Sequence, residues 1–147
     1  MVGPKAGGRK LAERISTRIA DLRGCPRQWA APTKDIIDDQ KVMIFSDHDR
    51  RVENGEVVLV CDDTLTTGES IRLTTVAAAQ MGGCVLPFSP VITRWLGVAM
   101  LTGNSIVSLV QMPHQVWTAQ GCPLCRVGSV ALRPKQSENW EMLNAPY

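Results

Sequence analysis

The feature that most constrains the fold is the stretch VVLVCDDTLTTGES at residues 57–70. Its first five residues, 57–61, are apolar and mostly β-branched, which predicts a strand buried on both faces of a parallel sheet. The adjacent acids Asp62 and Asp63 follow, and after a short turn the pattern over residues 69–81 predicts a helix. We therefore expect two carboxylates at the C-terminal edge of a sheet, which is where open α/β sheets bind ligands.

The rest of the chain repeats this alternation of strands and helices. Residues 9–22 predict a helix with one apolar stripe, formed by Leu11, Ile15, Ile19 and Leu22. Further strands are expected at residues 41–45, 84–88 and 105–110, and mostly loop at residues 25–40 and 46–56. This order predicts an α/β fold with a doubly wound, mostly parallel sheet.

Length and composition exclude several classes of protein. The 147 residues suit one domain, and 44% apolar residues are enough to form a core. A net charge of +2 does not indicate a nucleic-acid partner, and no apolar run approaches the roughly 20 residues of a membrane-spanning helix. With no signal-peptide pattern, the odd number of five cysteines predicts free or metal-bound thiols in the cytoplasm. We expect a core domain at residues 1–135 and a polar tail at 136–147, anchored by Trp140 and Leu143.

Charge is divided unevenly along the chain. Residues 1–34 hold eight basic and two acidic side chains, whereas residues 35–70 hold three basic and ten acidic ones. Two interpretations remain open, namely ordinary variation of the surface and a ligand that carries both phosphates and a metal ion.

The turn after the acid pair has the composition of an anion site. Thr64, Thr66 and Thr67 offer hydroxyl donors, and Gly68 lets the backbone approach a ligand closely. Backbone N–H groups in such a turn, with the positive end of the next helix, suit a phosphate monoester. The two carboxylates would accept hydrogen bonds from a neighbouring polyol or hold Mg²⁺ through water, so a sugar phosphate satisfies both halves. An ordinary helix cap explains Thr67 and Gly68 but not the acid pair.

This stretch resembles the phosphoribosyl-pyrophosphate-binding motif of the type I phosphoribosyltransferases. The motif has four mostly apolar residues, two acids, two further residues and Thr-Thr-Gly, which here reads VLVC-DD-TL-TTG, with Thr64 where an apolar residue is usual. The resemblance implies that Asp62 and Asp63 contact the ribose hydroxyls as the catalytic pair. It also implies that a loop holds the 5′-phosphate, and that loop comprises Thr64, Leu65, Thr66, Thr67, Gly68, Glu69 and Ser70.

The subfamily that the chain most resembles is orotate phosphoribosyltransferase. Residues 2–12, VGPKAGGRKLA, resemble its pyrophosphate loop, which wraps the diphosphate and its Mg²⁺. The residues in these positions are Gly3, Lys5, Ala6, Gly7 and Gly8. Taken alone, the sequence GPKAGG is also compatible with a simple turn.

A base-binding arginine is also implied by this resemblance. Thr93 and Arg94 stand where the subfamily has Asn-Arg or Asp-Arg, so Arg94 would bind the orotate carboxylate through its guanidinium group. Thr66 of the phosphate loop would contact the base as well. The residues alone leave open that Arg94 is a surface arginine at the end of a strand.

The C-terminal stretch at residues 112–135 resembles the tail of many orotate phosphoribosyltransferases, with a CPLC element and a later Pro-Lys pair. Cys122 and Cys125 of this element also form half of a tetrahedral zinc site. The candidates for the other half are Cys25, Cys84 and His114. Zinc is the minor interpretation because only one CxxC is present, and both histidines otherwise suit ordinary loops.

The resemblance implies a Mg²⁺-dependent transfer of ribose 5-phosphate from phosphoribosyl pyrophosphate to orotate, giving orotidine 5′-monophosphate and diphosphate in pyrimidine biosynthesis. It further implies small-molecule substrates, a homodimer, and neither a nucleic-acid nor a membrane partner. Such a reaction needs no covalent nucleophile, because catalysis comes from aligning base, sugar and leaving group.

Three departures from the family pattern keep other functions open. The chain opens at its pyrophosphate loop, so we expect no full strand before it and no N-terminal hood, as in a truncated or degenerate member. Residues 46–55, where the family has a mobile loop with a lysine, contain none, and Arg50 or Arg51 would have to substitute. Gly7 stands where some members have lysine. The alternatives are transfer to a purine or other base, a regulatory protein that binds phosphoribosyl pyrophosphate without turnover, and a small zinc-binding module.

Overall fold

The computed structural model describes residues 1–47, 50–96, 103–113, 115, 117–118, 120–129 and 137–143. The chain divides into two compact units, Met1–Gln115 and Val116–Tyr147. Among the described residues, the first unit contains the strands and the two long helices, and the second contains the short helices α3 (Pro123–Arg126) and α4 (Ser137–Leu143). The CPLC element therefore lies in the second unit, which begins before the boundary expected at residue 135.

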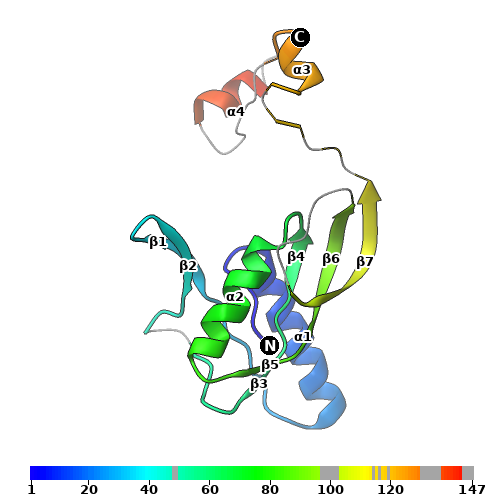
Figure 1. The fold of residues 1–147 in the computed structure, drawn as a ribbon. Coiled ribbons are helices and arrows are strands. Elements are labelled where there is room, and N and C mark those ends of the chain that lie inside the picture. The colour runs from blue at the N-terminus through cyan, green and yellow to red at the C-terminus, as the bar shows by residue number, and fades with distance from the viewer. Residues whose placement is uncertain are drawn as a thin grey trace. The chain divides into compact units, whose positions relative to one another are not determined.

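A layer of parallel strands forms the centre of the first unit (Figure 1). Its strands are β3 (Val57–Val58), β4 (Asp62–Leu65), β5 (Cys84–Val85), β6 (Phe88–Leu96) and β7 (Ser105–Pro113). β3 pairs with β5, β4 with β6, and β6 with β7, all in parallel. Val2 joins the layer on its other side, because its backbone forms parallel bridges to both Ala30 and Val60. Across the layer the order is thus Ala30, Val2, the segment that contains β3 and β4, the segment that contains β5 and β6, and finally β7.

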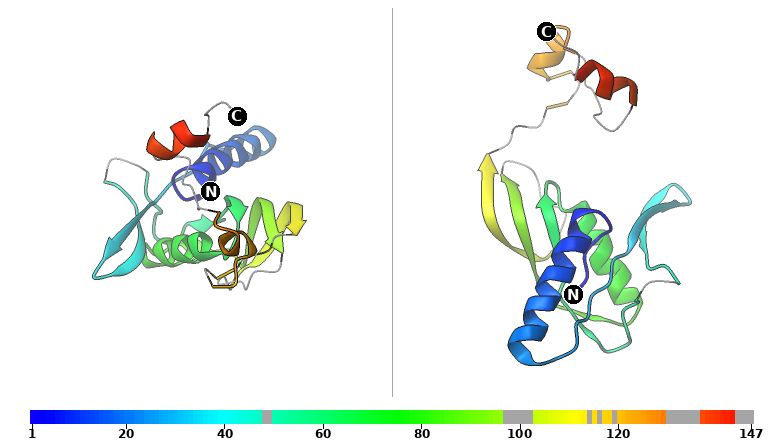
Figure 2. Two further views of the ribbon diagram at one scale, coloured as in Figure 1. Left: turned by 90° about the horizontal axis from the view of Figure 1, so that it is seen from above. Right: turned by 180° about the vertical axis from the view of Figure 1, so that it is seen from behind.

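Two helices cover opposite faces of this layer. Helix α1 (Gly7–Arg23) connects Val2 to Ala30, and helix α2 (Glu69–Gln80) connects β4 to β5. These connections move in opposite directions across the sheet, so right-handed crossovers place the helices on opposite sides. In Figure 1, α2 lies in front of the sheet and α1 lies behind it, and the view from behind in Figure 2 shows α1 in front. The predicted doubly wound α/β fold is confirmed.

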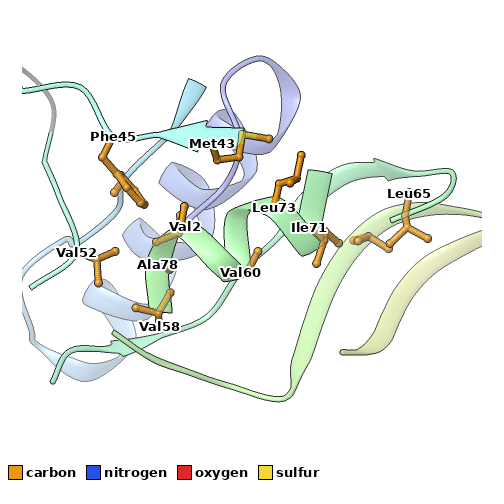
Figure 3. Packing of buried hydrophobic residues seen from close by; sticks show 13 residues of the cluster. Val2, Met43, Phe45, Val52, Val58, Val60, Leu65, Ile71, Leu73 and Ala78 are labelled. Atoms are coloured by element: carbon orange, nitrogen blue, oxygen red, sulfur yellow. The ribbon is translucent and has the colours of Figure 1, made fainter. Parts of the chain in front are cut away.

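The hydrophobic core joins the sheet to α2 (Figure 3). The sheet contributes Val2, Val58, Val60, Leu65 and Val91, and α2 contributes Ile71, Leu73, Ala77 and Ala78. Met43, Phe45 and Val52 extend the cluster toward the hairpin described below. Each fully buried aliphatic side chain of this kind contributes about 1.5–3 kcal/mol to stability, so buried residues such as Val58 and Val60 are main sources of stability.

Helix α1 packs on the sheet through small residues. Its buried residues are spaced by four, and they are Gly8, Ala12, Ser16 and Ala20. The apolar stripe is not the buried face, because Ile19 and Leu22 are 40% and 66% exposed. Small side chains let the helix axis lie close to the sheet, and Ser16 Oγ accepts a hydrogen bond from the backbone N–H of Gln28 at 2.7 Å.

Residues 33–44 form an antiparallel hairpin in which β1 (Thr33–Ile37) pairs with β2 (Gln40–Ile44). Asp38 and Asp39 form its turn with φ angles of 48° and 58°, which matches the twist that two-residue hairpins prefer. The prediction of mostly loop over residues 25–40 is therefore wrong for β1, whereas the strand expected at 41–45 is confirmed. Every residue of β1 is exposed, so no buried apolar pattern marks this strand in the sequence.

The strands of the sheet differ in extent from the prediction. β5 ends at Val85 and β6 begins at Phe88, so residues 84–88 do not form one strand, and Pro87, which has no N–H to donate, lies at the break. Apart from Phe88, the residues of β6 were not predicted as a strand. The strand expected at 57–61 is likewise split, and the acid pair lies within β4 rather than after a strand.

The second unit contains little buried surface in its described residues. Trp140 and Leu143, the expected anchors of the tail, are 58% and 49% exposed. Pro134 and Lys135, the Pro-Lys pair of the tail resemblance, lie outside the described residues. Among the residues that the structure describes, no helix has the length and apolar character needed to cross a membrane.

Candidate functional site

The connections of the sheet reverse direction between Val2 and the strand formed by β3 and β4. Helix α1 leads from Val2 to one side, and α2 leads from β4 to the other. The loops after these two strands therefore leave the C-terminal edge of the sheet on either side of a crevice, which is the usual ligand site of open α/β sheets. The two segments that the sequence singles out, residues 3–8 and 62–70, contain these loops together with the start of α1, the strand β4 and the start of α2.

Backbone hydrogen bonds fix the first loop. The N–H of Gly3 donates to the carbonyl of Ala30 at 3.1 Å, and the N–H of Lys5 donates to the carbonyl of Pro32 at 2.8 Å. Ala6 has a φ of 89° and a ψ of −127°, a conformation that costs a residue other than glycine on the order of 1–3 kcal/mol. Such strain persists only where the surroundings impose it, and it concentrates at ligand sites.

The two loops meet where glycines of α1 lie against the acid pair. A Cβ atom on Gly7 would overlap the carboxyl group of Asp63, and a Cβ atom on Gly8 would come within 2.9 Å of Asp62 Oδ1. A side chain at Gly7 would therefore require the Asp63 carboxyl group to move, and one at Gly8 would crowd Pro4 and Asp62. The structure thus brings the predicted diphosphate loop and the predicted ribose-binding pair together at one place.

Asp62 is the more deeply buried acid, with 8% of its surface exposed. Its Oδ1 accepts a hydrogen bond from the N–H of Asp63 at 2.9 Å, and Asp63 Oδ1 accepts one from the N–H of Thr64 at 2.8 Å. Burial, together with the neighbouring Asp63 side chain, raises the pKa of Asp62 to about 7, and the charge of Lys34 opposes this rise. A carboxyl group that titrates near neutral pH is typical of functional sites.

A hollow of about 150 Å³ opens at the end of β4. All seven residues predicted to hold a 5′-phosphate line it, together with Ile71, Asp62 and a residue that no motif indicated, Lys34. Gly68 precedes α2 with a φ of 83°, and Thr67 Oγ1 accepts a hydrogen bond from the N–H of Glu69 at 3.4 Å. Because the first N–H groups of a helix have no partner within it, this hollow has the donors that a phosphate requires.

Lys34 and Lys41 are functional candidates that no sequence pattern revealed. Both lie on the hairpin, and both form ion pairs with Glu69 at the start of α2, with N···O distances of 3.0 Å. These two contacts lower the pKa of Glu69. The hairpin thus brings positive charge to the rim of the hollow, which becomes visible only once the pairing of β1 with β2 is known.

Arg94 lies on the strand next to the phosphate loop. In the parallel pairing of β4 with β6, Arg94 stands opposite Leu65, and Thr93 stands opposite Thr64. Within the described part of the chain, the buried Nε atom of Arg94 has no hydrogen-bond partner. An unsatisfied buried donor costs about 1–3 kcal/mol, so its place at the edge of the site is consistent with a ligand acceptor.

The arginines suggested as substitutes for a loop lysine are engaged elsewhere. Arg50 pairs with Glu56 at 2.6 Å, and Arg51 pairs with Asp47. Residue 48, one of the two histidines, lies outside the described residues, as does His114. In the described structure Lys34 of the hairpin lines the phosphate hollow, whereas Arg50 and Arg51 do not.

The cysteines differ sharply in their surroundings. Cys61, which precedes the acid pair, is buried, and burial raises its pKa to about 12. Cys122 and Cys125 lie at the start of α3 in the second unit. Among the described residues, no group of three or more His, Cys, Asp or Glu side chains is placed to hold a metal ion. The zinc hypothesis for Cys122 and Cys125 thus gains no further ligand from this part of the chain.

Comparison with known sequences identifies relatives over part of their length. No protein-family model matches the chain. The chain is 39% identical over 80 residues to an orotate phosphoribosyltransferase of Acidithiobacillus ferrooxidans, a match that covers 54% of this chain and 41% of that protein. It is 34% identical over 83 residues to an orotate phosphoribosyltransferase of Heliobacterium modesticaldum, covering 56% and 43%. The chain thus spans less than half of the length of either relative.

Solved structures share the fold. An orotate phosphoribosyltransferase from Aeropyrum pernix matches with a TM-score of 0.56 and 18% identity over 76% of this chain and 59% of that one. An adenine phosphoribosyltransferase from Thermoanaerobacter pseudethanolicus matches with a TM-score of 0.55 and 20% identity over 76% and 68%. The fold is that of a type I phosphoribosyltransferase core. Within this class, the sequence relatives are orotate phosphoribosyltransferases.

Proposed function

We propose that the chain transfers ribose 5-phosphate from phosphoribosyl pyrophosphate to orotate, giving orotidine 5′-monophosphate and diphosphate. The observation that carries this proposal is the meeting of Gly7 and Gly8 with Asp62 and Asp63 beside the phosphate hollow. A ligand with a monoester, a ribose ring and a diphosphate would find one partner for each part. The names of the sequence relatives support orotate as the base.

Each part of the ligand is assigned to residues by its chemistry. The hollow of residues 64–70 takes the 5′-phosphate, because it combines helix N–H groups with threonine hydroxyls. Asp62 and Asp63 accept hydrogen bonds from the ribose hydroxyls. The loop at residues 3–8 wraps the diphosphate with its backbone N–H groups. Lys34 lines the hollow and supplies a positive charge to the anion.

Mg²⁺ suits the oxygen donors at this edge of the sheet. The cation prefers carboxylate and phosphate oxygens, and Asp62 and Asp63 offer carboxylates next to the proposed diphosphate loop. When bound, Mg²⁺ neutralises charge on the diphosphate leaving group. The chain's own contribution is to hold the ribose and diphosphate in line with the attacking base, and no covalent nucleophile is required.

Arg94 and Thr66 are assigned to the base. Arg94 stands beside β4 near the phosphate loop, and its buried Nε lacks a partner in the described structure. A guanidinium group binds a carboxylate through two parallel hydrogen bonds, which a purine base does not offer in the same form. Orotate is therefore the base that uses this arginine best.

Binding without turnover is the second candidate. It is favoured by the ion pairs of Arg50 and Arg51, which leave residues 46–55 without a described positive charge directed to the ligand. In this version the chain binds phosphoribosyl pyrophosphate as a signal for a partner. A homodimer is proposed in either case, since the resemblance implies one, and light scattering of the purified chain tests it.

The test separates binding from catalysis. Titration calorimetry with phosphoribosyl pyrophosphate and Mg²⁺ is expected to show saturable binding that Asp63→Asn weakens. Release of diphosphate that requires orotate would establish the transferase, whereas release with hypoxanthine or adenine would replace orotate by a purine. Binding with no release for any base would establish the second candidate. A folded sample that shows neither heat nor a thermal shift would contradict both.

A further inference from the structure

The thiol pair in the second unit has no part in the proposed transfer reaction. Cys122 is the residue before α3, and Cys125 is the third residue of that helix. The N–H of Arg126 donates to the carbonyl of Cys122 at 3.3 Å, which is the hydrogen bond of a helical turn. Helical geometry then places the two Cα atoms about 5 Å apart. This separation lies in the range of about 4.4–6.8 Å that a disulfide spans.

The contacts of the two sulfur atoms make them unequal. The backbone N–H of Cys125 donates to Cys122 Sγ at 3.3 Å, and the Cys125 side chain lies beside that sulfur. These contacts favour a thiolate at Cys122, whose pKa is lowered, while the pKa of Cys125 is raised. A thiolate next to a protonated thiol is the arrangement in which one sulfur attacks and the other resolves.

Both sulfurs of the pair are accessible. Cys122 is partly exposed and Cys125 is exposed. Leu124, which lies between them in the turn, is 59% exposed as well. Pro123 stands at the first position of α3, where its fixed φ stabilises the turn.

The other three cysteines of the chain do not share this arrangement. Cys25 and Cys84 are exposed, but neither has a second cysteine within three positions in the sequence. Cys61 is buried, and its high pKa keeps it as an unreactive thiol. They supply internal controls for exposure and for burial.

We propose that Cys122 and Cys125 form a redox-active dithiol that reacts with small disulfides such as oxidised glutathione. The Cys122 thiolate attacks one sulfur of glutathione disulfide, so that a mixed disulfide forms and one glutathione leaves as a thiolate. Cys125 then loses its proton to solvent and attacks Cys122 Sγ, which expels the second glutathione. The two cysteines are oxidised to one disulfide, and the glutathione disulfide is reduced to two thiols.

The experiment uses the whole purified chain in buffers of reduced and oxidised glutathione. Free thiols are trapped by alkylation, and peptides are identified by mass spectrometry. We expect one internal disulfide joining Cys122 and Cys125, which excess reduced glutathione reverses. In the variant Cys125→Ser, the reaction is expected to stop at glutathione on Cys122, at a rate roughly tenfold above that at Cys25 or Cys84.

Matched variants exclude a general effect of exposed thiols. Cys25→Ser and Cys84→Ser are expected to leave the oxidation of the pair unchanged, and Cys122→Ser is expected to leave Cys125 no faster than Cys25. All the substituted side chains are at least partly exposed, and circular dichroism checks that each variant is folded. The proposal is overturned if Cys122 and Cys25 react at equal rates, or if Cys125→Ser oxidises no differently from the parent chain.

Discussion

The carboxyl group of Asp63 occupies the space that a side chain on Gly7 would need. This contact joins the start of α1 to the start of β4, where the acid pair lies. The positive end of a helix favours a nearby carboxylate, so the start of α1 also stabilises the charge of Asp63. The distance in sequence between the two residues explains why neither motif alone predicted it.

Gly7→Ala tests this relationship. A Cβ atom would displace the Asp63 carboxyl group. A shift of about 1 Å in a positioned group lowers a reaction rate by up to roughly a hundredfold. We expect the affinity for phosphoribosyl pyrophosphate with Mg²⁺ to fall by at least about tenfold by calorimetry. Gly103→Ala is the control, since a Cβ atom there would meet nothing within 4 Å. Equal affinities for the two variants would contradict the assignment of Gly7.

Stability is expected to depend on pH through Asp62. Its pKa rises from an ordinary value of 3.8 to about 7 on folding, chiefly because of burial, so the folded chain binds a proton that the unfolded chain has released. The stabilisation is complete below about pH 4 and is lost as the pH rises through 7. This difference between the pKa values of the folded and unfolded chain corresponds to on the order of 4 kcal/mol in the free energy of unfolding.

The variant Asp62→Asn removes this titration. Urea unfolding between about pH 5 and 8 is expected to show a smaller loss of free energy of unfolding with rising pH in Asp62→Asn than in the parent chain. Glu13→Gln, at an exposed position of α1, serves as the control and keeps the parent slope. Parallel curves for Asp62→Asn and the parent would mean that Asp62 is charged in the folded chain throughout this range.

The order of elements was predictable where apolar residues mark the buried side of a strand or helix. The apolar residues 57–60 predict a central strand, and the acids and threonines after them predict an anion site. The hairpin was not predictable in this way, because β1 is exposed along its whole length. No sequence pattern therefore indicated Lys34, although it lines the phosphate hollow.

The packing of α1 shows a second limit of sequence reasoning. Periodicity identifies an apolar stripe, but the buried face of α1 consists of small residues that carry little hydrophobic signal. The close approach of the helix to the sheet depends on the absence of side-chain volume at Gly8 and Ala12. The periodicity of a sequence does not show how the volumes of distant segments fit together. The residues of a motif, in contrast, can be recognised directly in the sequence.

Glu69→Gln is expected to strengthen anion binding. Glu69 accepts hydrogen bonds from Lys34 and Lys41, and the variant removes a negative charge from the rim of the hollow and releases both ammonium groups. We expect the affinity for inorganic phosphate or ribose 5-phosphate to rise by roughly threefold to tenfold at low ionic strength and less at high salt. Glu13→Gln again serves as the matched change of charge. Weaker binding in Glu69→Gln would mean that the ion pairs are needed to hold the hairpin at the site.

Arg94→Lys probes the base assignment under turnover. Lysine keeps the charge but cannot form two parallel hydrogen bonds to a carboxylate. We expect the KM for orotate to rise by roughly tenfold or more while the KM for phosphoribosyl pyrophosphate changes little. Steady-state release of diphosphate measures both constants. Equal increases in the two constants would remove Arg94 from the base site and favour a structural role for it.

Ala12→Leu and Ile19→Ala together test how α1 packs. Ala12 is fully buried and faces the sheet, so leucine there overpacks a close contact and is expected to lower the free energy of unfolding by about 1–3 kcal/mol. Ile19 is 40% exposed, and its replacement by alanine is expected to cost less than about 1 kcal/mol. Urea unfolding monitored by circular dichroism gives both values. A larger loss for Ile19→Ala than for Ala12→Leu would show that the apolar stripe is the buried face of α1, contrary to the structure.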